Sequence, residues 1–213
     1  MSETSSTPPL RRDAARNRER ILSAARELVA ERGADIALDD IAVQAGVGIA
    51  TLYRRFPTRA DLLDELVLEE LQACVDAANE ALTLSDPWKG FEQFVTALCL
   101  RHARTRGANE LLTMIVADSA PIVAARAQLR AATRRLMERA KRSGDLRADF
   151  AETDIPCLLF AVAGLLRTTR EAAPDAWRRL LSYVLDAYRV HDGRRLPPRL
   201  TDRQLYAAIT GRH

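Results

Sequence analysis

Apolar residues recur at three- and four-residue spacing along almost the whole chain, and no stretch alternates convincingly between apolar and polar residues. Near the N-terminus the spacing is carried by Ile21, Ala24, Ala25, Leu28 and Val29. It places side chains on one face of a helix, whereas a half-buried strand needs a period of two. The sequence therefore predicts an all-α fold of about nine helices, with three in an N-terminal head and six in a larger body.

Capping and turn residues divide this pattern into segments. Thr58 is followed three residues later by Asp61, and Asp86 precedes Pro87, as is typical of helix N-termini. Further helices are expected to begin at Asn109, Pro121, Thr153 (as a cap) and Pro174, with a weak helical piece near Leu205. The expected segments are a disordered leader (1–11), the head (12–57), the body (58–192) and a C-terminal tail (193–213).

The composition excludes several classes of protein. The chain has 213 residues, of which 47% are hydrophobic and 29% charged, as in ordinary soluble globular proteins. No apolar run approaches the roughly 20 residues of a membrane helix, and the polar start "MSETSSTPPL" lacks a signal-peptide pattern. Cys74, Cys99 and Cys157 form no C-x-x-C pair and are expected to be reduced, buried residues. We therefore expect a cytoplasmic protein with no membrane partner.

The stretch "AGVGIATLYRRFP", from Ala45 to Pro57, allows two interpretations. A phosphate-binding glycine loop would need a buried strand before it or a Gly-Lys-Ser/Thr ending, and neither is present. A helix-turn-helix needs a small residue where its helices touch, a sharp turn, and an apolar residue pointing back into the core. Ala42, Gly46 and Leu52 meet those needs in that order. A structural αα-hairpin remains the alternative, but it does not require outward basic and aromatic residues beside the turn.

The run "LDDIAVQAGVGIATLYRRFPTRADLL" resembles the signature of the TetR family of transcriptional regulators, with its G-V-x-x-x-T-L-Y-x-x-F-x-x-[KR] pattern. The resemblance covers roughly residues 16–63, and the body is similar to the SbtR-like subgroup in helix pattern and length. The resemblance implies a homodimer in which each subunit has a DNA-binding head and a helical body with a ligand pocket. It implies a ligand-responsive regulator, most simply a repressor, that is not an enzyme and needs no cofactor.

The resemblance also implies which residues would contact a near-palindromic, double-stranded operator. By motif position, Thr51, Tyr53, Arg55 and Arg59 would hold the DNA backbone, and Gly48 would let the main chain approach closely. Ile49 and Ala50 could meet thymine methyl groups, while Arg54 is the candidate for a hydrogen bond to guanine.

The sequence departs from the family pattern at two positions of the head. Ala37 stands where a phosphate-binding Ser or Thr is common, and Asp39 replaces a residue that is frequently basic. The arginine-rich N-terminal arm, especially Arg11, Arg12 and Arg16, could compensate by reaching the adjacent backbone or minor groove. On charge alone, the arm also fits a solvated helix face.

The body is expected to supply the dimer interface and the ligand pocket. Ala161 and Gly164 would allow close approach of a second subunit. The expected interface residues are Leu159, Ala163, Leu166, Trp177, Leu181, Val184 and Tyr188, which could instead complete the monomer core. The candidate pocket residues are Phe91, Phe94, Leu98, His102, Asn109, Thr113, Met114, Phe160 and Thr169, each of which could instead be an ordinary core residue. The mostly aliphatic composition favours an apolar or amphipathic small-molecule effector.

Other functions are weighed against this one. His102 is the only histidine within the predicted helices, and no second ligand stands at metal-binding spacing, so no metal site is expected. No serine elbow, Cys–His pair or carboxylate cluster indicates an enzyme. An activator with the same head and a low-specificity DNA-packaging protein stay open as alternatives.

Overall fold

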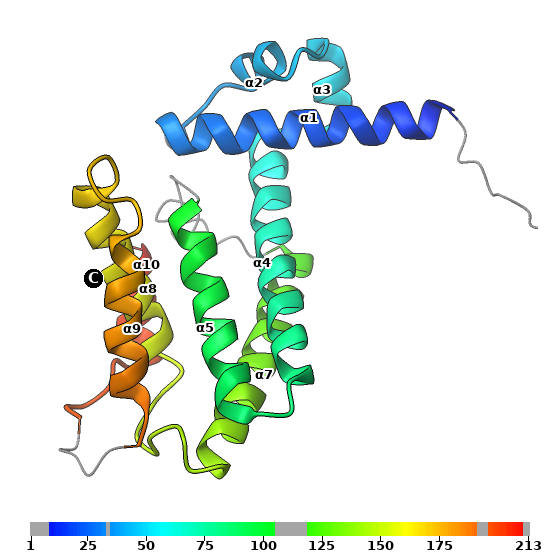
Figure 1. Cartoon of the computed structure of the whole chain (residues 1–213). Helices are drawn as coiled ribbons and strands as arrows, with labels where there is room; N and C mark the ends of the chain where they lie inside the picture. Colours follow the sequence, from blue (N-terminus) through cyan, green and yellow to red (C-terminus); the bar gives the residue numbers. More distant parts are fainter. Residues whose placement is uncertain (1–8, 33–34, 105–118, 191–195, 211–213) are drawn as a thin grey trace, which may run out of the picture. The chain divides into compact units, whose positions relative to one another are not determined.

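The computed structural model describes residues 9–32, 35–104, 119–190 and 196–210 (Figure 1). These residues form helices and no named strand, so the predicted all-α fold is confirmed. The helices are α1 (Pro9–Arg32), α2 (Leu38–Ala45), α3 (Ile49–Arg55), α4 (Arg59–Thr83), α5 (Pro87–Arg104), α7 (Ala120–Arg142), α8 (Asp154–Thr169), α9 (Ala176–Tyr188) and α10 (Asp202–Thr210). Within the described ranges, no helix is both long and apolar enough to span a bilayer.

The N-terminal unit extends to Leu66 and the C-terminal unit begins at Val67. The first turns of α4 therefore belong to the N-terminal unit, whereas the expected boundary placed everything from residue 58 in the body. In the N-terminal unit, α1 lies across α2 and α3 (Figure 1). The buried side chains of this unit include Leu22, Leu28, Ile41, Leu52 and Leu62.

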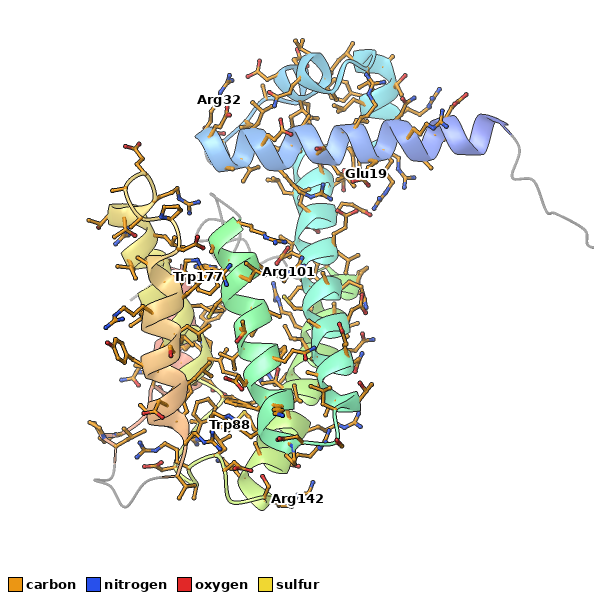
Figure 2. All side chains as sticks on the ribbon, in the orientation of Figure 1. Glu19, Arg32, Trp88, Arg101, Arg142 and Trp177 are labelled. Carbon is orange, nitrogen blue, oxygen red and sulfur yellow. The ribbon has the colours of Figure 1, made fainter. Side chains whose placement is uncertain are left out.

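The C-terminal unit is built around α5, which packs against α7 and α8 and also contacts α9 (Figure 1). Aromatic rings fill its core. The ring of Phe91 lies edge-on to that of Phe150 at 5.4 Å, and the ring of Phe150 lies 4.7 Å from that of Tyr188. Trp88 and Trp177 are both buried in the same core, near opposite ends of the unit (Figure 2). Such rings bury large apolar areas and favour these tilted arrangements.

Most of the predicted helix starts are confirmed. The carboxylate of Asp86 accepts a hydrogen bond from the Lys89 amide at 3.0 Å. Thr58 and Asp61 form a reciprocal capping box, in which the Asp61 amide donates to the Thr58 hydroxyl at 3.1 Å. The weak helical piece near Leu205 is α10. The helix expected from Asn109 to Ala117 lies outside the described residues.

Two predicted helix starts are wrong in detail. Thr153 occupies the position before α8, but its hydroxyl makes no capping hydrogen bond because its backbone is already helical, at φ −68° and ψ −14°. The carboxylate of Asp154 instead accepts a hydrogen bond from the Ala151 amide at 2.7 Å. The last long helix begins at Ala176 rather than Pro174, after a turn.

Arg139 connects α7 to the end of α4. Its guanidinium donates hydrogen bonds to the carbonyl oxygens of Leu82 and Leu84, each at 2.6 Å. The last carbonyl groups of a helix have no partner within that helix and carry partial negative charge. A half-buried arginine from another helix therefore caps the C-terminal end of α4.

Candidate functional site

The turn between α2 and α3 depends on Gly46. Its backbone is left-handed, at φ 60° and ψ 41°, and its amide donates to the Val43 carbonyl at 3.1 Å. Glycine adopts this conformation at little cost because it has no Cβ. The Gly46 carbonyl accepts a hydrogen bond from the Arg20 guanidinium at 2.8 Å, so α1 holds the turn in place. Sequence reasoning predicted Gly46 but missed Arg20, because no local pattern connects it to the turn.

The outward face of α3 carries most of the residues predicted to contact DNA. Leu52 is fully buried on the inner side, and Phe56 closes the end of the helix. Ile49 is 41% exposed and Tyr53 46% exposed. Gly48, Ala50, Arg54 and Arg55 are also exposed, and Thr51 is half-buried. At 100° per residue, positions 49, 50, 53 and 54 share a sector of about 140° opposite Leu52.

Two of the other predicted DNA contacts lie on neighbouring helices. Arg16 is exposed on α1, while the side chains of Arg11 and Arg12 are outside the described part of the chain. Arg59, at the start of α4, forms an ion pair with the exposed carboxylate of Asp35. A DNA phosphate near Arg59 would have to compete with that carboxylate. Exposed pairs of this kind contribute little, so the exchange would cost little free energy.

The C-terminal unit contains a cavity of about 350 Å³ lined by residues of α4, α5, α7, α8 and α10. Its volume is at the lower end of the range for small-molecule sites. Apolar side chains form most of the wall, among them Leu71, Leu98, Leu129 and Ile155. The C-terminal helix α10 contributes Asp202 and Leu205.

The acidic groups of the cavity wall are largely neutralised by arginines. Glu70 accepts two hydrogen bonds from Arg101, at 2.8 and 2.7 Å, and Figure 2 shows Arg101 reaching from α5 towards α4. Glu152 accepts two from Arg134, both at 3.0 Å. Burial lowers the pKa of His102 below its usual 6.5, which keeps the imidazole neutral at pH 7.

The cysteines do not supply reactive thiolates. Cys74 lines the cavity, and burial raises its pKa to about 11. The pKa of buried Cys99 rises to about 12 for the same reason, and Cys74, Cys99 and Cys157 are all free of disulfides. Within the described residues, no three potential metal-binding side chains gather in one place.

Four of the predicted pocket residues, Phe94, Leu98, His102 and Phe160, line this cavity. Phe91 does not, because its ring is fully buried against Trp88 and Phe150. Thr169 does not either, since its hydroxyl donates to the Leu165 carbonyl of its own helix at 3.0 Å. Asn109, Thr113 and Met114 lie outside the described residues. Sequence reasoning missed the polar wall residues Glu70, Arg126, Arg130, Thr133 and Thr153.

The predicted dimer residues fall into three groups. Leu166, Trp177 and Leu181 are buried in the core of their own subunit, and Ala163 is 8% exposed, so these side chains offer almost no surface to a partner. Leu159 lines the cavity, and Tyr188 packs on Phe150. Val184 is half-buried beside Tyr183, which is 60% exposed. On α8, Ala161 is exposed and Gly164 half-buried.

Two family models match the chain. The family described as bacterial regulatory proteins, tetR family, matches residues 21–66. A second, described as the transcriptional regulator SbtR-like C-terminal domain, matches residues 86–190. The first match includes α2, α3 and the turn between them, and the second includes α5, α7, α8 and α9.

Individual relatives agree with these matches. A TetR transcription regulatory protein from Mycobacterium vanbaalenii is 30% identical with a TM-score of 0.59, and the alignment covers 85% of this chain and 100% of that one. A TetR transcriptional regulator from Streptomyces coelicolor is also 30% identical, with a TM-score of 0.57 and coverage of 81% and 98%. An HTH-type transcriptional regulator of Staphylococcus aureus strain USA300 is 38% identical over 63 residues, 29% of this chain and 34% of its own length. The chain thus spans only about a third of the curated relatives that it matches.

Proposed function

The chain belongs to the TetR family of bacterial regulatory proteins, and from that premise we propose that it regulates transcription by binding operator DNA as a homodimer. We place its action in the cytoplasm, where the DNA of a bacterium lies. The family is one of regulatory proteins rather than enzymes.

The observation that carries the proposal is the outward face of α3. Tyr53, Arg54 and Arg55 stand exposed on the second helix of a helix-turn-helix, while Leu52 anchors the helix from behind. This helix has two arginines in its last turn and no acidic residue in its first. A helix of this kind enters the major groove in helix-turn-helix proteins, with flanking groups on the phosphates. Arg54 then reads a base, and Thr51, Tyr53 and Arg55 position the protein.

Small-molecule control is proposed to act through the cavity of the C-terminal unit. α4 begins in the N-terminal unit, where Leu62 is buried, and continues into the C-terminal unit, where Glu70 and Leu71 line the cavity. In one conformation of the dimer, the distance between the two DNA-binding heads would not match the operator. A ligand that binds better to that conformation would shift the population away from the DNA-bound state. The protein would then be a repressor released by its effector.

The test begins with selection of bound sequences from random duplexes, followed by anisotropy titrations on the selected and a random duplex. Tyr53→Ala is expected to weaken binding to both duplexes by similar factors, because a backbone contact carries no sequence information. Arg54→Ala is expected to cost roughly 5- to 150-fold on the selected duplex only, the range for one base contact. Arg142→Ala, which removes the same charge from an exposed position on α7, is the control. Equal losses on both duplexes for Arg54→Ala would refute the base-reading role.

Two alternatives give different results in the same experiments. A DNA-packaging protein would enrich no common near-palindrome and would not discriminate between the two duplexes. An activator would also enrich a common near-palindrome. In a purified transcription system, however, it would raise rather than lower transcription from a promoter that carries this sequence.

A further inference from the structure

The turn between α2 and α3 is held from outside by one arginine of α1. Its own amides pair with the end of α2: the Gly46 amide donates to the Val43 carbonyl and the Val47 amide to the Ala42 carbonyl, each at 3.1 Å. The Gly46 carbonyl instead accepts a hydrogen bond from the Arg20 guanidinium at 2.8 Å, across 26 positions of the chain. A charged donor makes a stronger hydrogen bond than a neutral one. Arg20 therefore joins α1 to the segment that leads into α3.

The guanidinium of Arg20 lies close against Gly46. A Cβ at position 46 would lie 2.6 Å from a guanidinium nitrogen, so the glycine leaves the room that the guanidinium occupies. Arg20 is an exposed residue. Its hydrogen bond therefore adds little to the stability of the whole fold, because water competes for both groups. The main effect of the contact is to restrict the turn.

The face of α1 that carries Arg20 continues in both directions. Arg16 lies one turn earlier and is exposed, and Glu27, two turns later, accepts a hydrogen bond from Gln44 of α2 at 2.8 Å. Residues at these spacings lie on one side of a helix. Along α1, α3 lies nearer the N-terminal end than α2 does (Figure 1). Arg20 thus lies on this face between the α2 contact at Glu27 and the candidate DNA contact Arg16.

Contacts to bases and contacts to phosphates tolerate displacement to different degrees. A hydrogen bond to a base edge weakens steeply when its distance or angle departs from the preferred range. The attraction between a cation and the phosphates falls slowly with distance and is similar for every sequence. A looser turn before α3 therefore costs more in base reading than in backbone binding.

We propose that Arg20 is a positioning residue for sequence recognition. Its hydrogen bond to the Gly46 carbonyl fixes the orientation of α3 against α1, so that Arg54 meets a base edge. With α3 held in this way, Arg16 on α1 binds the DNA backbone at the same time. This role rests on the proposed function, because it needs α3 in the major groove. Arg20 contacts the turn rather than the DNA, so its removal reduces discrimination between sequences and leaves the salt dependence of binding unchanged.

Anisotropy titrations of the full-length protein on the selected and the random duplex, each at several salt concentrations, test this role. Arg20→Met keeps the aliphatic stem and removes the guanidinium. It is expected to lower the affinity for the selected duplex about tenfold, as for a lost base contact, and the affinity for the random duplex less than about twofold. Arg26→Met, which removes the same charge from an exposed position on another face of α1, is the control and is expected to change neither affinity.

Two results of these titrations overturn the proposal. Similar losses on both duplexes, with a salt slope lower by about one, would make Arg20 a phosphate contact. Unchanged affinity for both duplexes would mean that the hydrogen bond to Gly46 does not affect recognition.

A double-mutant cycle tests whether Arg20 acts through base reading. In an Arg54→Ala background the base contact is already lost, so adding Arg20→Met is expected to cost less than about threefold on the selected duplex. A loss as large as in the wild-type background would mean that the two residues act independently, and would contradict the positioning role.

Hydrogen exchange separates positioning from general destabilisation. Arg20→Met is expected to speed amide exchange in residues 47–56 about fivefold or more, because its hydrogen bond restrains the turn and α3. Exchange in α5 and the melting temperature are expected to stay unchanged. Unaltered exchange in residues 47–56, or faster exchange throughout the chain, would contradict the proposal.

The wild-type protein separates this inference from the proposed function. If the wild-type protein does not discriminate between the two duplexes, the proposed regulatory function fails, and the role of Arg20 fails with it. If the wild-type protein discriminates and Arg20→Met discriminates equally well, only the role of Arg20 fails.

Discussion

At the scale of single residues, His102 links the cavity to pH. Burial is the largest cause of its lowered pKa; Arg170 acts in the same direction and Glu70 opposes both. The unfolded chain has a histidine pKa near 6.5, so it takes up the proton before the folded protein does as the pH falls. The stability conferred by the neutral imidazole is complete above about pH 6.5 and is lost as the pH falls through the lower, folded-state pKa.

We therefore expect the free energy of unfolding to decrease between pH 7.5 and pH 5, with a smaller decrease in His102→Leu. Urea titrations monitored by circular dichroism at several pH values measure this difference directly. Parallel pH dependence in the two proteins would mean that His102 has the same pKa folded and unfolded.

The role of a single residue could be predicted from the sequence where that role depends on residues nearby in the chain. His102 was expected to face the body interior because it continues an apolar stripe with Phe94 and Leu98, and all three line the cavity. Thr153 holds the N-cap position of α8 as expected, but its hydroxyl makes no capping hydrogen bond, because its backbone dihedrals are helical and the local sequence does not report them.

At the scale of elements, the α2–α3 turn is the most sensitive to the addition of a single side-chain atom. A Cβ on Gly46 would be strained at φ 60° and would lie 2.6 Å from a guanidinium nitrogen of Arg20. Gly46→Ala is expected to destabilise the protein by about 1–2 kcal/mol. Gly48→Ala is the control, because a Cβ there meets only the Thr51 hydroxyl, at 4.0 Å. Thermal unfolding compares the two, and equal loss would contradict the argument from the turn.

The end of α4 depends on α7 in a comparable way. Arg139→Met keeps much of the aliphatic stem but removes two charged hydrogen bonds to the Leu82 and Leu84 carbonyls. The expected loss in the free energy of unfolding is about 2 kcal/mol, measured by urea titration. Arg135→Met, one turn earlier on the same helix and exposed, should change it by less than about 0.5 kcal/mol.

Element positions were largely predictable, because apolar spacing and caps are local signals. The start of α5 at Pro87 and the capping box before α4 both follow from neighbouring residues. The Arg139 contacts were not predictable, since they join residues 55 and 57 positions apart and no local pattern reports such a distance.

At the scale of the whole molecule, the proposed homodimer needs a surface that the subunit leaves open. A Cβ at Gly164 would have no neighbour within 4 Å, and Tyr183 is 60% exposed on the adjacent helix α9. Gly164→Arg should therefore fit the subunit but collide with a partner packed on α8 and α9. We expect its dimer dissociation constant to rise by about a hundredfold or more, and its affinity for a near-palindrome to fall with it.

Sedimentation equilibrium measures this change, and Val123→Arg, the same kind of substitution at an exposed apolar position on α7, is the control. If the Gly164→Arg protein is still dimeric, the dimer interface does not lie on α8 and α9. The sequence could not resolve this surface: Leu166, Trp177 and Leu181 lie on the same helices as the exposed residues, and an apolar stripe does not say whether it faces its own core or a second subunit.

The cavity of the C-terminal unit also bears on how long the protein lasts in a cell. Occupancy of the cavity stabilises the folded chain by mass action, and proteases act mainly on the small unfolded fraction. Molecules with their effector bound should consequently be degraded more slowly than empty ones. The steady-state amount of the protein would then rise with effector supply, even at a constant rate of synthesis.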